Sequence, residues 1–255
     1  MNASQKTKLI AISTQKGGPG KTTLTAMACS EMHYRLGYNV AAFDCDYPQL
    51  SLSRMRERDL KAVMHNEVYK KLAHHQFTSL NKKAYPIIPC RATDVLQEAE
   101  KLIATSAVPP DAIFFDLPGT VNTPGVLTTL AGVHHIFAPI TADRVVVEST
   151  LGFIDVLVNV LMKKGNTNIE TIHLFWNQVD GREKSSLYQA YESVISELGL
   201  SLMESFITDS KRFRKEVEDS ARTVFRSTLL PANTRLMKGC KLDLFITELL
   251  KVAKF

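Results

Sequence analysis

The stretch that decides the fold lies near the N-terminus and reads Gln15-Lys16-Gly17-Gly18-Pro19-Gly20-Lys21-Thr22-Thr23. It follows a short apolar run, residues 9–13, and a helical pattern over residues 21–36 begins within it. This strand–loop–helix order is where α/β proteins bind phosphate, because it places backbone N–H groups and a helix N-terminus at the end of a strand. A chance match to its specified positions is on the order of one in a million. We therefore predict a phosphate-binding loop.

Each residue type in this loop suits an anion. Glycines let the backbone amides curve around phosphate, Lys21 adds a positive charge near the β- and γ-phosphates, and the Thr22 hydroxyl can bind magnesium. Pro19 has no N–H group, so the loop has one donor fewer at this position. The residues predicted to bind the nucleotide here are Gly17, Gly18, Gly20, Lys21, Thr22 and Thr23.

Short apolar segments alternate with helical patterns along the rest of the chain. The predicted strands are residues 9–13, 40–44, 85–88, 112–116, 135–139, 172–176 and 228–230, with residues 202–207 as a weaker eighth. The predicted helices are residues 21–36, 93–106, 143–164, 185–198, 209–219 and 242–254, with a basic helical stretch within residues 50–76. This alternation predicts an α/β fold: a doubly wound, mostly parallel sheet of about seven or eight strands flanked by helices.

The composition is that of one folded domain. The chain has 255 residues, of which 45% are hydrophobic and 22% charged, and these values exclude a disordered or rod-like protein. Nothing in the sequence divides it, so residues 1–255 are expected to form a single domain. The 31 Lys and Arg residues exceed the 26 Asp and Glu residues and give a net charge of +5, which permits an acidic partner.

Neither the cysteines nor the apolar runs indicate a special site or a membrane anchor. The four cysteines are Cys29, Cys45, Cys90 and Cys240. Their spacing fits neither a zinc site nor a redox dithiol, and buried thiols in a reducing cytosol are expected. The longest apolar stretch, residues 153–162, is interrupted by Asp155 and Asn159 and is shorter than the roughly 20 residues of a membrane span. A cytoplasmic protein is therefore predicted.

Three carboxylates follow predicted strands and are expected to gather beside the phosphate loop. Asp44 and Asp116 end the strands at residues 40–44 and 112–116, and Asp46 lies two residues beyond Asp44. Magnesium bound with a nucleotide takes few protein ligands and several waters. Thr22 is therefore the predicted direct ligand, while Asp44 and Asp116 hold the waters of the metal. Asp46 is placed to orient the water that attacks the phosphate.

Together these motifs resemble the ParA/MinD superfamily of dimerising ATPases. Gln15 stands where the plain P-loop pattern has its first glycine, whereas the deviant form with a second lysine, Lys16, matches. Three further segments are similar to the family's switch I, its Walker B with switch II, and its adenine-reading motif: Asp44-Cys45-Asp46-Tyr47-Pro48-Gln49, Asp116-Leu117-Pro118-Gly119 and Asn177-Gln178-Val179-Asp180. The match extends to Pro231-Ala232-Asn233. The segments Tyr47-Pro48-Gln49 and Ser210-Lys211-Arg212-Phe213-Arg214 look most similar to the ParA-like TraA proteins of Bacteroides-type conjugative transposons.

The resemblance implies a function and roles for single residues. It implies a switch that dimerises with ATP and Mg²⁺, binds DNA non-specifically, and hydrolyses ATP slowly when a partner protein stimulates it. The process would be DNA segregation or conjugative transfer, with the ATP-bound protein on the nucleoid. Asn177 and Pro231 would contact the nucleotide, and Lys16 would cross the dimer interface to the partner's nucleotide. Lys16, Lys21 and Asp46 are the predicted catalytic residues.

The positive charge is concentrated near the C-terminus. Residues 211–241 contain three acidic side chains and nine basic ones: Lys211, Arg212, Arg214, Lys215, Arg222, Arg226, Arg235, Lys238 and Lys241. Such clusters bind nucleic-acid phosphates without reading the sequence, and a solvated basic face is the alternative interpretation. A second basic stretch, residues 54–61, follows the segment similar to switch I.

Other proteins with this loop provide alternative functions. A MinD-like, membrane-cycling ATPase is the main alternative, since residues 242–254 have an apolar face. That face equally fits a helix that covers the sheet, and this is the interpretation we favour. An iron–sulfur reductase is excluded because residues 116–125 contain no cysteine. A small synthetase has the same loop, but Lys16 and the Pro48-Gln49 pair favour the ParA type.

Overall fold

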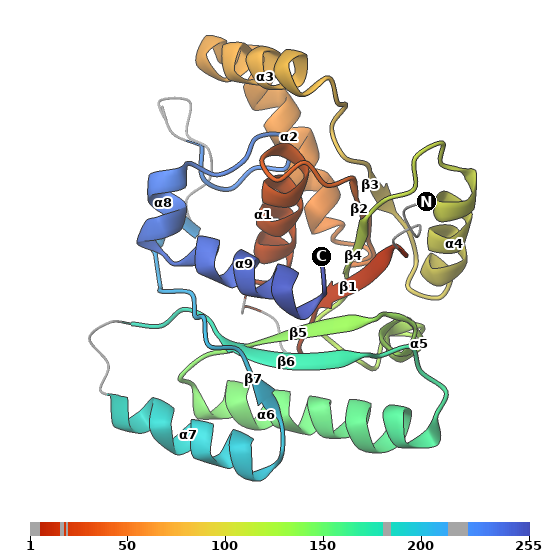
Figure 1. The fold of residues 1–255 in the computed structure, drawn as a ribbon, viewed down its shortest axis with the longest axis vertical. Coiled ribbons are helices and arrows are strands. Elements are labelled where there is room, and N and C mark those ends of the chain that lie inside the picture. The colour runs from red at the N-terminus through yellow and green to blue at the C-terminus, as the bar shows by residue number, and fades with distance from the viewer. Residues whose placement is uncertain (1–5, 16–17, 19, 181–184, 214–223) are drawn as a thin grey trace.

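A computed structural model describes residues 6–15, 18, 20–180, 185–213 and 224–255. Within this part, seven parallel strands form one sheet in the order β3-β2-β4-β1-β5-β6-β7 (Figure 1). The strands are β1 (Lys8–Ile12), β2 (Val40–Asp44), β3 (Ile87–Pro89), β4 (Ala112–Asp116), β5 (His135–Ile140), β6 (Thr171–Trp176) and β7 (Ser201–Leu202). Because β1 lies in the middle, between β4 and β5, the chain winds outward in both directions. The predicted doubly wound α/β fold is confirmed.

Helices cover both faces of the sheet (Figure 1). On one side lie α1 (Lys21–Tyr34), α2 (Ser51–His65), α3 (Glu67–Leu80), α8 (Thr234–Gly239) and α9 (Leu242–Val252). On the other side lie α4 (Val95–Thr105), α5 (Val126–Gly132), α6 (Arg144–Asp155) and α7 (Ser185–Glu197). Shorter helical segments are η1 (Val156–Leu161), η2 (Met162–Lys164) and η3 (Lys211–Phe213).

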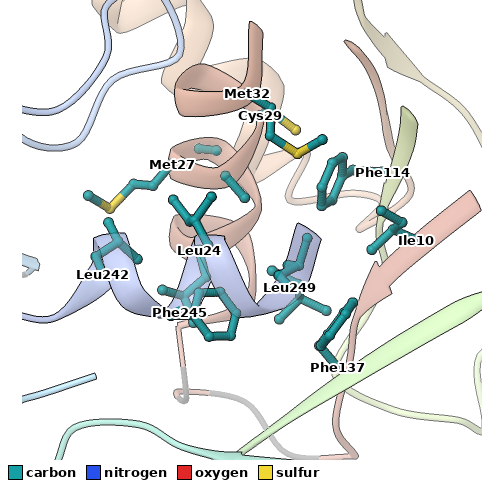
Figure 2. Packing of buried hydrophobic residues seen from close by; sticks show 14 of the residues in the cluster. Ile10, Leu24, Met27, Cys29, Met32, Phe114, Phe137, Leu242, Phe245 and Leu249 are labelled. Carbon is teal, nitrogen blue, oxygen red and sulfur yellow. The ribbon is translucent and has the colours of Figure 1, made fainter. Parts of the chain in front are cut away.

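Alternate residues of each central strand enter opposite halves of the core. Ile10 and Phe114 pack with α1 and α9, whereas Ala11 and Phe115 pack with the helices of the other face. Because successive side chains of a strand point to opposite faces, a strand buried on both sides reads as a continuous apolar run. Figure 2 shows the first half of the core, between the sheet, α1 and α9.

The apolar face of the last helix belongs to this core. Leu242, Phe245 and Leu249 of α9 are 1%, 0% and 0% exposed. The interpretation that residues 242–254 form a helix covering the sheet is confirmed. A face buried in this way cannot at the same time lie on a membrane.

Two predicted strands in the C-terminal half are wrong or too long. Residues 228–230 form no strand, because Thr228 is bound to α2 instead of to the sheet. The backbone N–H and the hydroxyl of Thr228 both donate to Asp59 Oδ2, over 2.6 and 2.9 Å. The predicted strand at residues 202–207 is reduced to Ser201–Leu202, followed by a single bridge between Val179 and Thr208.

The helix prediction differs from the structure in four places. The stretch at residues 50–76 is two helices, because Asn66 ends α2 and caps α3 through Oδ1, which accepts from the N–H groups of Val68 and Tyr69. Helices α5 and α8 were not predicted. Of the helix predicted at residues 209–219, the structure describes residues 209–213, of which Lys211–Phe213 form a 3₁₀ turn.

Helix α6 continues without a break and is longer than the apolar run in the sequence. The stretch Arg144–Lys164 has 21 residues and contains an 18-residue window with a mean hydropathy of 1.9, so by length and composition it is sufficient to cross a membrane. The apolar stretch at residues 153–162 is thus part of a longer apolar helix, at the place where a helix over residues 143–164 was predicted. In the structure Phe153 and Leu157 pack into the core, while Glu148 and Asp155 are exposed. One stripe buried on a sheet and one charged stripe in solvent are typical of a core helix.

His135 of β5 makes stability depend on pH. Its side chain is 0% exposed, and Nδ1 shares a hydrogen bond with Thr171 Oγ1 over 2.9 Å. Burial lowers the pKa of His135 from 6.5 to about 4, against the opposing charge of Glu170. Below about pH 6.5 the unfolded chain therefore binds a proton that the folded chain excludes, and stability falls down to about pH 4. Between pH 7 and pH 4.5 we expect the wild-type protein to lose about 2 kcal/mol more stability than His135→Asn.

Urea unfolding at the two pH values measures this difference. His74 is exposed on α3, so His74→Asn is the matched control and should leave the pH dependence of wild type unchanged. Equal losses of stability in wild type and His135→Asn would contradict the assignment.

Candidate nucleotide-binding site

The loop after β1 brings a helix N-terminus to the carboxyl edge of the sheet. Gly18 and Gly20 have φ angles of 101° and 81°, a left-handed conformation that glycine adopts without strain. Gly20 is the N-cap of α1 and has no side chain that could cap the first-turn N–H groups of this helix. Such amides are an anion-binding arrangement. Lys16, Gly17 and Pro19 lie outside the described residues, so their predicted roles stay predictions.

Two buried carboxylates lie side by side next to this loop. Asp44 ends β2 and Asp116 ends β4, and the two residues are partners in the parallel ladder. Both are 0% exposed. The Thr22 hydroxyl donates to Asp116 Oδ1 over 3.1 Å, and the Ser53 N–H of α2 donates to Asp44 Oδ2 over 2.7 Å. The structure thus brings together the three residues predicted at the metal.

The remaining oxygens of this pair suit a cation. Asp44 Oδ1 and Asp116 Oδ2 are buried and have no hydrogen-bond partner among the described residues. Buried carboxylate oxygens are normally paired, and a hydrated metal ion would pair both. Within the described ranges no three His, Cys, Asp or Glu side chains form a metal cluster. Magnesium needs none, because it takes one or two carboxylates plus phosphate and water. The residues fit Mg²⁺ bound with a nucleotide.

Burial shifts the pKa values of the ionisable side chains in this cluster. It raises the pKa of Asp116 to about 7, with the Thr22 hydrogen bond acting in the opposite direction. Burial also lowers the pKa of Lys21, which is 9% exposed, while the charges of Asp116 and Asp46 oppose this shift. A buried lysine against buried carboxylates gains most from a ligand that carries both phosphate and a metal ion.

Asp46 is half-buried at the start of the turn between β2 and α2. Burial raises its pKa, Lys21 lowers it and Asp44 raises it further, so the three groups act on one another. The main-chain carbonyl of Asp46 accepts from Leu50 N–H over 2.7 Å. The backbone therefore closes this turn without the carboxylate.

A cavity of about 300 Å³ adjoins the phosphate loop. Its lining residues are Gly18, Gly20, Thr23, Leu24, Asn177, Gln178, Asp209 and Phe213. A β-carbon added to Gly20 would lie 3.5 Å from Asn177 Nδ2, so the predicted base-binding Asn177 reaches the loop. The volume is at the lower end of small-molecule sites. It leaves room for the base of a nucleotide whose phosphates lie in the loop.

Pro231, the other predicted nucleotide contact, lies elsewhere. It lines a second cavity, of about 420 Å³, together with Arg35. Arg35 donates to the carbonyl of Ala232 over 2.7 Å and holds this segment against the end of α1. Pro231 is not among the residues that line the cavity of Asn177.

Two further residues, for which the sequence analysis predicted no nucleotide contact, line the first cavity. Asp209 and Phe213 come from the segment after β7, and the Asp209 N–H donates to Val179 O over 2.9 Å. This bond holds the segment beside the end of β6. The ring of Phe213 packs edge-on against Phe225, with centroids 5.0 Å apart. The sequence predicted a strand at residues 202–207 and a helix at residues 209–219, and neither element indicated that this segment lies beside Asn177.

The basic residues near the C-terminus have different environments. Lys211, Arg212, Arg235 and Lys238 are exposed. Arg226 is half-buried and donates to Phe213 O over 3.1 Å, and Lys241 Nζ lies 3.7 Å from the centre of the Phe206 ring. Arg214, Lys215 and Arg222 lie outside the described residues. Part of the predicted basic cluster is thus structural, and Lys211 and Arg212 directly precede Phe213 of the cavity.

Three solved structures with the same fold illustrate the likeness. A plasmid partition protein of Borrelia burgdorferi B31 bound to AMPPNP has 17% identity and a TM-score of 0.58, covering 95% of this chain and 98% of its own. Cobyrinic acid a,c-diamide synthase of Mycobacterium smegmatis with ADP and magnesium has 18% identity and a TM-score of 0.58, covering 81% and 88%. MinD in the MinC:MinD cell division complex of Aquifex aeolicus has 15% identity and a TM-score of 0.53, covering 80% and 83%.

The sequence itself gives the family. No curated protein is significantly similar to the chain. Residues 10–224 match the family described as the CobQ/CobB/MinD/ParA nucleotide binding domain, and they include the end of β1, the phosphate loop and the carboxylates. The chain belongs to the CobQ/CobB/MinD/ParA nucleotide-binding domain family.

Proposed function

We propose that this protein is a Mg²⁺-dependent ATPase that works as a dimerising switch on DNA. One observation carries the ATPase part: Thr22, Asp44 and Asp116 meet at a phosphate loop, and two of their buried oxygens have no partner among the described residues. The family match and the nucleotide-bound neighbours support the same chemistry. The cargo we propose is a segregating plasmid or a conjugative element.

The residues divide the work of phosphoryl transfer. Lys21 and the first-turn amides of α1 hold the β- and γ-phosphates, and Thr22 with Asp44 and Asp116 holds the metal and its waters. Magnesium, when bound, neutralises charge on the phosphates. Asp46 accepts a hydrogen bond from a water and directs its oxygen at the γ-phosphorus, so that the bond to the β-phosphate oxygen breaks and ADP and phosphate leave. Lys16 of a second copy adds positive charge across the dimer.

DNA binding is proposed for the exposed basic residues beside the nucleotide cavity. Lys211 and Arg212 form the first two residues of η3, whose third residue, Phe213, lines that cavity. A nucleotide in the cavity therefore contacts the segment that carries this basic pair, which supports an ATP-dependent affinity for DNA phosphates. Contacts of this type are independent of DNA sequence and weaken with salt. We propose that a partner protein stimulates hydrolysis and releases the dimer, and that the protein is cytoplasmic and joins the nucleoid with ATP.

Co-sedimentation with duplex DNA and with anionic liposomes, each with and without ATP, tests this proposal. We expect ATP-dependent binding to DNA, and we expect the double change Lys211→Glu and Arg212→Glu to weaken it about 10-fold and to reduce its salt dependence. The matched control is Lys163→Glu with Lys164→Glu, two exposed lysines at the end of the α6 stretch. Stronger ATP-dependent binding to liposomes than to DNA at equal salt would instead support a MinD-like role.

A further inference from the structure

Helices α2 and α3 form an open groove that the nucleotide site does not use. The groove has a volume of about 620 Å³. It is lined by Leu60, Val63, Lys70, Ala73, His74, Phe77, Thr78, Lys82, Lys83, Ala84 and Leu229. In Figure 1, α3 lies beyond α2 at the outer edge of the molecule.

The floor of the groove is apolar and its rim is basic. Ala73 and Leu229 are 6% and 3% exposed and form the floor, while Leu60 is 47% exposed at the edge. Lys70 stands on α3, where its Nζ lies 3.5 Å from Glu67 Oε1, and Lys82 and Lys83 follow that helix. The Lys82 ammonium donates to the carbonyls of Gly37 and Tyr38, while Lys83 is exposed. Among the described residues that line the groove, none is acidic.

The floor is held in place by polar contacts beneath it. The Gln76 side chain donates to Leu229 O over 2.8 Å, and Tyr69 and Ala73 pack with Leu229 and Leu230 in a small core of their own. Asp59 of α2 accepts two hydrogen bonds from Thr228, the neighbour of Leu229. The groove is therefore a preformed surface of two helices and one anchored strand-like segment, and binding there needs little ordering of the chain.

We propose that this groove is the docking site for an amphipathic segment of a partner protein, whose apolar side chains fill the floor and whose acidic side chains face the lysines. Charge complementarity selects this occupant: an apolar floor suits helix-in-groove recognition, and a lining with three lysines and no acidic residue favours Glu and Asp around the apolar anchors. Nucleic acid carries the negative charge but has no apolar side chains for the floor, so the groove matches it less well.

The groove is connected to the metal carboxylates through one helix. Ser53, in the first turn of α2, donates its N–H to Asp44 Oδ2, and Leu60 and Val63 of the same helix line the groove. A segment bound in the groove therefore contacts the helix whose start touches Asp44. A partner protein bound here contacts the same helix that binds one of the metal carboxylates. The docking proposal itself does not rest on the proposed ATPase cycle.

Fluorescence anisotropy of two synthetic peptides on the full-length protein tests the docking site without nucleotide. Both peptides have leucines at the same helical spacing, and they differ only in carrying glutamates or lysines at the flanking positions. We expect the glutamate peptide to bind at least 10-fold more tightly. Leu60→Asp, and separately the pair Lys70→Glu with Lys83→Glu, should each weaken its binding at least 10-fold.

Two control variants separate the groove from the general positive charge of the protein. Met64 is 72% exposed one turn after Leu60 but does not line the groove, and Lys71 is the exposed neighbour of Lys70 that also lies outside it. Met64→Asp and Lys71→Glu should leave the affinity for the glutamate peptide within about 2-fold. Equal binding of the two peptides, no binding, or equal losses in the control variants would overturn the proposal. Displacement of the peptide from the wild-type protein by duplex DNA would also overturn it. So would light scattering that finds a dimer without nucleotide which Leu60→Asp dissociates.

Discussion

Replacing Lys21 with alanine is expected to weaken ATP binding at least about 100-fold. The Lys21 side chain is 9% exposed at the start of α1, where burial lowers its pKa and the charges of Asp116 and Asp46 raise it. A charge-assisted contact to phosphate in such a place is worth about 3 kcal/mol, which corresponds to this factor. Titration calorimetry with ATP and Mg²⁺ measures it.

The control for this change is an exposed lysine. Lys61→Ala, on the surface of α2, should bind ATP as wild type does. Because Lys21 also offsets two buried carboxylates, the variant should be checked by its melting temperature, and Lys21→Gln keeps most of the side-chain volume. A folded Lys21→Ala protein with unchanged ATP affinity would remove the phosphate-binding role of the loop.

The parts of the site that could be predicted are those fixed by strand geometry. Asp44 and Asp116 end strands in the sequence, and parallel pairing brings them together at one edge of the sheet whichever strands lie beyond. Thr22 follows the loop directly, so its distance from this edge is determined by the start of a helix. The succession of strand, loop and helix along the chain was therefore sufficient to predict these contacts.

The parts that could not be predicted depend on packing between distant segments. Residues 228–230 are as apolar as a strand, yet buried Asp59 on α2 supplies the hydrogen-bond partner that a neighbouring strand would have provided. The residues on the nucleobase side of the site could not be predicted for the same reason. Pro231 and Asp209 both follow apolar segments near the C-terminus, and backbone hydrogen bonds between residues 207–209 and the end of β6 place Asp209 in the cavity that Asn177 lines.

Short helices were missed for a further physical reason. Helix α5 has seven residues and α8 has six, which is too short for a clear helical period in the sequence. Asn66 stands inside a helical pattern, and its side chain caps the second of two helices because it competes with the backbone for N–H groups. The groove between α2 and α3 exists because of this break, so it too was outside what the sequence could indicate.

Asp46→Ala is expected to lower ATP turnover about 100-fold while the affinity for ATP and Mg²⁺ stays the same or rises slightly. A carboxylate near the γ-phosphate repels it, so removing Asp46 costs nothing in binding. Its raised pKa, caused first by burial, makes it a better acceptor for a water hydrogen. Asp46→Asn should lose turnover to a similar extent, because an amide of the same shape is a weaker acceptor and no base. Asp44→Ala should differ by also losing the Mg²⁺ dependence of ATP binding.

The alternative role for the Asp46 carboxylate is a structural one, closing the turn before α2. The backbone geometry of this turn argues against that role. Leu50 N–H is bound by the main-chain carbonyl of Asp46, so the carboxylate can be removed without opening the turn. Asp46→Ala should therefore melt close to wild type while its ATP-bound dimer accumulates, because hydrolysis is the step that resets the switch. Steady-state turnover, light scattering with ATP and the melting temperature, measured on one preparation, test this together. A lower melting temperature with normal turnover per folded molecule would place Asp46 outside the reacting site and assign the water-directing role to another group.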